Sequence, residues 1–168
     1  MATLPRRSAH WHPCGAFAGL LCAAGSAHYD RFRERLLEGR AELVEQLMIK
    51  AGERVVELGA GTGRNAEYYR AQIPNLAGVE LVDLCPALLA QARRRVIQWA
   101  NVAVIEADAT HYRPSGEVDH VYFSYALTMI PDWSTAIEGV TYLSCGDWVD
   151  SALRENTDGQ LELIHWGR

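Results

Sequence analysis

The sequence predicts an α/β fold, a doubly wound and mainly parallel sheet flanked by helices. Short apolar strands alternate with amphipathic helical segments along the chain, and this alternation is typical of parallel sheets. A glycine-rich turn at residues 59–63 follows the apolar run Val55–Leu58 and precedes a helical segment. Of the 168 residues 49% are apolar, which is enough for one domain with its own core.

We expect residues 28–168 to form this domain and residues 1–27 to be a poorly ordered or peripheral segment. An arginine pair followed by an apolar run at 14–24 has the outline of a signal peptide, so a cleaved leader is the alternative. The apolar run is too short to span a bilayer.

Charge and cysteine patterns narrow the possible partners. Residues 101–168 carry eleven acidic and three basic side chains. Binding of nucleic acid needs concentrated positive charge, so this composition argues against a nucleic-acid partner. The four cysteines show no C-x-x-C spacing, so neither a disulfide framework nor a zinc site is predicted. We therefore expect a cytoplasmic protein without nucleic acid or metal.

The first predicted helix spans residues 29–48, where apolar side chains recur at helical spacing. Arginines fill the positions between them. We expect these arginines to form a solvated face, with contact to anionic lipid headgroups as an alternative, so that the protein would be membrane-associated. They are Arg31, Arg33, Arg35 and Arg40.

The glycine loop directly follows the first strand. Its spacing, G-x-G-x-G, differs from the dinucleotide fingerprint, and Glu57 just before it would repel a pyrophosphate and attract an amino group. We expect free loop amides and a helix over Arg64–Ala71 capped by Thr62. S-adenosylmethionine, which carries an amino group and a sulfonium, suits such a loop. The pattern E-x-G-x-G-x-G resembles the first motif of class I S-adenosylmethionine-dependent methyltransferases, and a glycine turn without a ligand is the alternative.

The second strand is predicted at Leu76–Leu84. Asp83 lies about 20 residues beyond Gly63, the separation at which a strand-end carboxylate reaches a ribose in Rossmann-like sheets. Glu80 is the competing candidate for this contact. We rank Asp83 above Glu80 because Asp83 directly precedes the loop that follows the second strand.

The remaining predicted elements continue the alternation of helices and strands. A helix begins at Pro86 and runs to Trp99, with Arg93, Arg94 and Arg95 expected on its exposed side. Strands follow at Val102–Glu106 and Val118–Phe123. Ligands of such sheets bind where the strands end, and the polar residues at those ends are Glu57, Asp83, Asp108 and Ser124.

Three segments resemble one particular family within this class. Residues 29–32, Glu80–Leu89 and Tyr122–Trp133 resemble the methyltransferases of betaine-lipid synthesis, which methylate the amine of diacylglyceryl-homoserine, and the similarity covers about residues 28–140. The resemblance implies that Glu57 binds the methionine amino group, Asp83 the ribose and Asp108 the adenine. It implies the cofactor-binding residues Glu57, Gly59, Ala60, Gly61, Gly63, Asp83, Leu84, Asp108, Ala109 and Ser124, and the acceptor-side, catalytic residues Tyr29, Ser124 and Tyr125.

The C-terminal part departs from the family pattern, which continues with a fifth strand and an antiparallel hairpin. Asp132–Leu143 reads as a helix, and only Leu161–Trp166 reads as a further strand. We therefore expect a sheet cut short after its fourth strand, with an uncovered edge that favours a homo-oligomer.

The predicted function is methyl transfer from S-adenosylmethionine to the amine of a lipid headgroup such as diacylglyceryl-homoserine. A small-molecule N- or O-methyltransferase of the same superfamily is one alternative. A catalytically silent cofactor-binding remnant is another.

Overall fold

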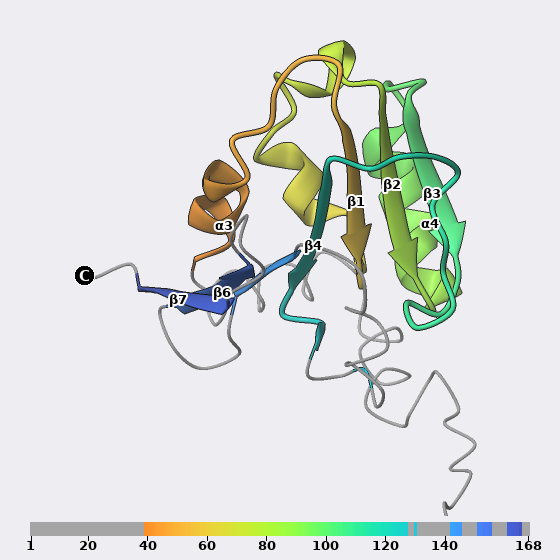
Figure 1. Ribbon diagram of the computed structural model, residues 1–168. Coiled ribbons are helices and arrows are strands. Elements are labelled where there is room, and N and C mark those ends of the chain that lie inside the picture. The colour runs from red at the N-terminus through yellow and green to blue at the C-terminus, as the bar shows by residue number, and fades with distance from the viewer. Residues whose placement is uncertain (1–38, 128–129, 131–141, 146–150, 156–160, 166–168) are drawn as a thin grey trace, which may run out of the picture.

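The computed structural model describes residues 39–127, 130, 142–145, 151–155 and 161–165. Its centre is a seven-stranded sheet of order β3-β2-β1-β4-β5-β6-β7 (Figure 1). The first five strands pair in parallel, and β6 and β7 are antiparallel to their neighbours. This confirms the α/β fold with a mainly parallel sheet. The strands are β1 Arg54–Leu58, β2 Gly78–Asp83, β3 Val102–Glu106, β4 His120–Ser124, β5 Tyr142–Cys145, β6 Ser151–Glu155 and β7 Leu161–His165.

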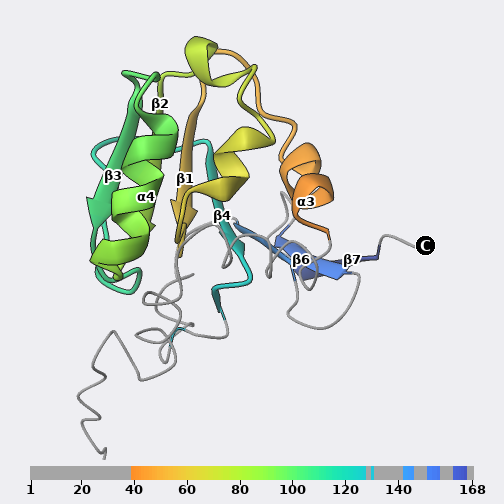
Figure 2. The same cartoon turned by 180° about the vertical axis from the view of Figure 1, so that it is seen from behind.

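Three helical elements lie on one face of the sheet (Figure 2): α3 (Arg40–Gln46), the 3₁₀ turn η1 (Arg64–Glu67) and α4 (Pro86–Val96). A second 3₁₀ turn, η2, spans Ile73–Asn75. The helical elements bury apolar side chains against the alternate residues of β1, β2 and β4 that face them. The opposite face is covered instead by the segment between β3 and β4, through side chains such as Tyr112 and Val118.

The helix after the glycine loop is shorter than predicted. Only η1 forms, Gly63 is its N-cap with φ 68°, and no side chain caps it, so the role expected of Thr62 is not found. Ala66 and Tyr69, three residues apart, are both buried against the sheet. The segment therefore still packs one side against the sheet although it is shorter than predicted.

The expected truncation of the sheet is wrong. β4 is not an edge, because β5 pairs with it in parallel and β6 and β7 continue the sheet. Tyr142 and Leu143, expected to end a helix, lie in β5, and residues 131–141 are outside the described part of the chain. The strand predicted from Leu161 is confirmed as β7. The edge on which the prediction of a homo-oligomer depended is therefore occupied.

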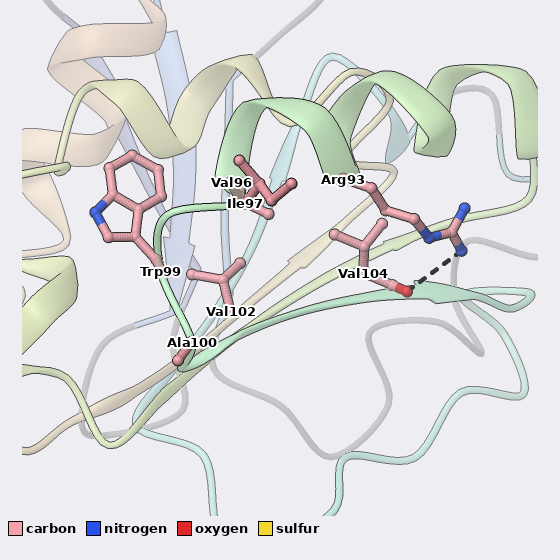
Figure 3. Close-up of a pocket in the computed structure, with 7 residues that line it drawn as sticks. All are labelled: Arg93, Val96, Ile97, Trp99, Ala100, Val102 and Val104. Carbon is pink, nitrogen blue, oxygen red and sulfur yellow. Dashed lines mark hydrogen bonds between the residues drawn. The ribbon is translucent and has the colours of Figure 1, made fainter.

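An open pocket lies between the outer strand β3 and α4 (Figure 3). Arg93 donates from Nη2 to the carbonyl of Val104 across it, at 3.5 Å. The pocket is lined by Arg93, Val96, Ile97, Trp99, Ala100, Val102 and Val104, none of which is a predicted site residue. Most of these residues precede β3 or begin it, so the pocket lies away from the ends of the strands.

No helix in the described ranges is long and apolar enough to span a bilayer. The boundary between residues 1–27 and the domain lies outside the described residues and stays a prediction.

Candidate functional site

The carboxyl ends of the four strands β1 to β4 meet at one edge of the sheet (Figure 1). Leu58 at the end of β1 pairs with Val82 on one side and Phe123 on the other, and Asp83 pairs with Glu106. The structure therefore brings the strand-end residues predicted from the sequence to the same edge. Tyr29 lies outside the described residues.

The glycine loop is shaped by backbone conformation and close packing. Gly59, Gly61 and Gly63 have φ of 76°, 56° and 68°, the left-handed region that favours glycine. A Cβ atom on Gly59 would lie 2.2 Å from the Cβ of Ala126, which follows β4. The loop thus sits directly against the segment that leaves β4.

The prediction of free loop amides is wrong for most of the loop. The amides of Gly59 and Ala60 both donate to the Val82 carbonyl, at 2.8 and 2.9 Å, and Gly63 donates to the Ala60 carbonyl at 2.9 Å. The turn uses these donors itself because it folds back over the end of β2. A ligand here would be recognised chiefly by side chains around the loop.

Asp83 stands against the loop. Its Oδ2 accepts from the Gly61 amide and its Oδ1 from the Cys85 amide, both at 2.8 Å. A carboxylate oxygen can accept more than one hydrogen bond, so these contacts leave Asp83 able to bind hydroxyl groups. Its contact with a ribose stays a prediction.

Glu80, the competing candidate, lies on the opposite face of β2 and is only 4% exposed. It accepts from Ser115 Oγ at 2.8 Å and from the Tyr112 hydroxyl, and Arg54 Nη1 lies 3.6 Å from its Oε1. These partners tie the segment after β3 to the sheet. The structure therefore places Asp83, and not Glu80, beside the glycine loop.

Glu57 lies in a buried polar cluster behind the loop. Its Oε1 accepts from Asn65 Nδ2 at 2.6 Å and its Oε2 from the Tyr122 hydroxyl at 2.9 Å. Burial, and then the negative charge of Glu57, raise the pKa of Tyr122 well above its usual value, so the hydroxyl stays a neutral donor. The sequence carried no signal for Asn65 or Tyr122 as partners. The predicted contact of Glu57 with an amino group remains a prediction.

Asp108 follows β3 at the same edge and is half-buried. Its Oδ1 accepts from the amide of Thr110 at 2.9 Å and from the Thr110 hydroxyl at 2.7 Å. Partial burial opposes ionisation, but these hydrogen bonds and the nearby His111 outweigh it and lower the pKa of Asp108. The side chain is therefore an ionised acceptor at neutral pH. Its neighbour Ala109 packs against the core of the opposite face.

Ser124 and Tyr125 end β4 beside the glycine loop. Ser124 is 2% exposed, and Tyr125 packs partly buried against the helix-covered core. Tyr125 has φ 55°, a conformation that costs free energy for a residue with a side chain, and such strain often accompanies functional sites. The acceptor roles of both residues remain predictions.

The expectation that all three arginines of α4 are exposed is wrong for Arg95. Arg93 and Arg94 are exposed, but Arg95 folds back onto the glycine loop. Its Nη1 donates to the Thr62 carbonyl, and its Nε lies 2.7 Å from Glu67 Oε1. Arg95 therefore joins α4 to the glycine loop and to the last residue of η1.

Replacing Arg95 by glutamine should lower the free energy of unfolding by about 1 kcal/mol, a small value because Glu67 is 36% exposed and water screens the pair. Urea denaturation measures the change. Arg94→Gln, on the exposed side of the same helix, is the matched control and should change little. Equal losses in the two variants would show that the contact with the loop contributes nothing.

A glycine loop after the first strand of a parallel sheet, with carboxylates ending the second and third strands, defines a class I S-adenosylmethionine-dependent methyltransferase. Residues 55–143, more than half the chain, match the family described as a methyltransferase domain, and the chain belongs to that family. Its cofactor is S-adenosylmethionine.

Curated relatives include the trans-aconitate 2-methyltransferases of Methylobacterium nodulans and Klebsiella pneumoniae. Each is 32% identical to this chain, over 63% and 64% of its residues. The chain spans 40% and 41% of the length of these two relatives. The betaine-lipid resemblance is thus supported only at the level of the class.

Solved structures share the fold. A methyltransferase from Aquifex aeolicus superposes with a TM-score of 0.56 at 16% identity, over 67% of this chain and 65% of that one. A methyltransferase from Geobacter sulfurreducens, in complex with S-adenosyl-L-homocysteine, gives a TM-score of 0.51 at 19% identity, over 65% and 48%.

Proposed function

We propose that this chain is the cofactor-binding part of an enzyme that transfers a methyl group from S-adenosylmethionine to a small molecule, with a carboxylate oxygen as the acceptor. The observation that carries the proposal is the position of Asp83 against the glycine loop, at the edge where the strands end. The relatives named trans-aconitate 2-methyltransferase support a small organic acid as the acceptor class.

The described residues fit the cofactor. Asp83 would hold the ribose hydroxyls, Asp108 the adenine amino group and Glu57 the amino group of the methionine part. Asn65 Oδ1 is buried without a hydrogen-bond partner in the described part of the chain, which leaves an acceptor for a further donor. When bound, S-adenosylmethionine supplies a methyl group on a good leaving group.

The protein's contribution to such a reaction is mainly orientation. A well-positioned pair of reactants reacts far faster than the same pair free in solution, so the edge formed by Ser124 and Tyr125 would align the acceptor. A carboxylate with a pKa near 4 is already ionised at neutral pH, so it needs no general base.

The amine of a lipid headgroup is the second candidate, and it rests on the resemblance of Glu80–Leu89 and Tyr122–Trp133 to betaine-lipid enzymes. One part of the predicted lipid-facing surface does not support it. Arg40, expected on that solvated face, is only 5% exposed. Membrane contact and a lipid acceptor are therefore the less favoured proposal.

The stability of the methylated product to alkali distinguishes a carboxylate acceptor from the amine of a lipid headgroup. The protein is incubated with S-adenosylmethionine labelled in its methyl group, together with a mixture of small di- and tricarboxylates and vesicles that contain diacylglyceryl-homoserine. We expect labelled methyl esters, which alkali hydrolyses to volatile labelled methanol. Label that is stable to alkali and extracts with the lipid would contradict a carboxylate acceptor. Cofactor binding without any labelled product would support the silent remnant.

A further inference from the structure

The outer strand β3 ends the sheet on one side. It is the first strand in the order β3-β2-β1-β4-β5-β6-β7, and both views show it at the margin of the sheet (Figures 1 and 2). On its inner side β3 pairs with β2, and the Ala107 amide, just beyond β3, donates to the Asp83 carbonyl at 3.1 Å. Backbone groups of successive residues in a strand point to opposite sides. Those of Val102, Val104 and Glu106 therefore point away from β2.

This outer edge has few of the features that prevent association. Edge strands are commonly protected by proline, lysine or a bulge, and β3, with the sequence VAVIE, contains neither proline nor lysine. Val102 and Val104 line the open pocket beside the edge, together with Ile97, which is 81% exposed (Figure 3). The edge thus combines outward backbone groups with exposed apolar side chains, as a surface that pairs with a further strand does.

Two opposite charges lie beside the edge. Arg93 reaches β3 from α4, and its Nη2 donates to the Val104 carbonyl at 3.5 Å, a long and weak contact. Glu106, at the end of β3, is exposed, and its side chain has no partner among the described residues. Val104 packs against the helix-covered core, so Glu106, two residues later, points to the same face of the sheet. A cation and an anion therefore lie on one face without pairing in the described part of the chain.

We propose that the outer edge of β3 pairs in antiparallel fashion with β3 of a second copy of this chain, about a two-fold axis at Val104. Such pairing places Val102 opposite Glu106 of the second copy, and the outward backbone groups of the two strands face each other. Val102 and Arg93 line the same pocket, so Glu106 of the second copy lies beside Arg93. The two-fold axis repeats this contact, which gives two ion pairs in each dimer.

A second copy suits this edge because β3 and α4 together carry both halves of the contact. The cation of one copy meets the anion of the other, and Val104 meets Val104. A strand from another protein would have to supply an acidic residue at one particular position. The carboxyl ends of the two β3 strands point in opposite directions in this arrangement, so the candidate cofactor sites of both copies stay open.

Sedimentation velocity of the full chain over a dilution series measures the association, and we expect an equilibrium between monomer and dimer. Arg93→Glu places like charges opposite each other at both contacts, so the dimer should weaken at least about tenfold. Glu106→Arg should weaken it to a similar extent for the same reason. Arg94→Glu makes the same charge change at the next, exposed position of α4, outside the pocket, and this matched control should dimerise like the wild type.

Mixing the two charge-reversed variants tests whether the charges meet across the interface. A mixed dimer of Arg93→Glu with Glu106→Arg has opposite charges at both contacts, so the mixture should dimerise about as well as the wild type, although each variant alone does not. Thermal unfolding followed by circular dichroism shows whether each variant is folded. If a charge-reversed variant does not fold, Arg93→Gln or Glu106→Gln takes its place, with a smaller loss of dimer.

Four results would overturn the proposal. Wild-type protein that is monomeric throughout the dilution series would exclude a second copy and leave the edge to a different partner. Stronger association of Arg93→Glu would mean that Arg93 protects the edge. An equal loss in Arg94→Glu would reduce the effect to net charge. A mixture that associates no better than its two components would mean that Arg93 and Glu106 do not meet.

Discussion

Gly59→Ala should lower the free energy of unfolding by about 3 kcal/mol or more and abolish cofactor binding. The new Cβ would lie 2.2 Å from the Cβ of Ala126, and the φ of 76° is one that alanine rarely adopts. Overpacking and backbone strain each cost about 1–3 kcal/mol, and here they act at one residue. Urea denaturation and titration with S-adenosylhomocysteine measure the two effects.

Substitutions at two further glycines distinguish the effect of overpacking from the effect of backbone strain. Gly52 has φ 86° with nothing within 4 Å of an added Cβ, so Gly52→Ala reports strain alone. An added Cβ on Gly116 would also have nothing within 4 Å, and the φ of Gly116 is not in the left-handed region, so Gly116→Ala should be nearly neutral. If Gly59→Ala were no more damaging than Gly52→Ala, the contact between the loop and the segment after β4 would not matter.

Asp83→Ala should weaken cofactor binding by about 1–3 kcal/mol while the protein stays folded. The substitution removes the predicted acceptor of the ribose hydroxyls and also the acceptor of the Gly61 amide, which positions the loop. Calorimetric titration with S-adenosylhomocysteine gives the change in affinity.

Glu80→Gln is the control for Asp83, because Glu80 lies on the same strand and faces the opposite side. Its partners Tyr112 and Ser115 would lose a charged acceptor, so we expect a loss of stability with unchanged affinity. The opposite pattern, in which Glu80→Gln loses affinity and Asp83→Ala does not, would move the ribose site to Glu80.

Local sequence patterns predicted the strands that form the site. Val102–Glu106 was predicted with the bounds that the structure shows, since a short apolar run with turns on both sides leaves little choice. β5 and β6 were missed for a different reason. β6, Ser151–Glu155, has a weak strand pattern of its own, and in the structure it is paired on both sides, with β5 and with β7.

The arginines show a second limit of sequence patterns. Helical periodicity assigned Arg40 and Arg95 to solvated faces, but one is buried and the other contacts the Thr62 carbonyl. A long side chain can fold back across its own helix, so residue type alone does not fix where its charge lies. Asp83 was predicted at the end of the second strand, and the structure places it there, where its carboxylate accepts from the Gly61 amide.

Titration of ¹⁵N-labelled protein with S-adenosylhomocysteine, followed by backbone amide resonances, tests the central claim most directly. If the strand-end edge is the cofactor site, saturable shifts should be concentrated at the glycine loop, at Leu84, at Ala109 and at Tyr125. The absence of saturable shifts would contradict the claim. So would shifts confined to the pocket between α4 and β3, around Val96 and Trp99.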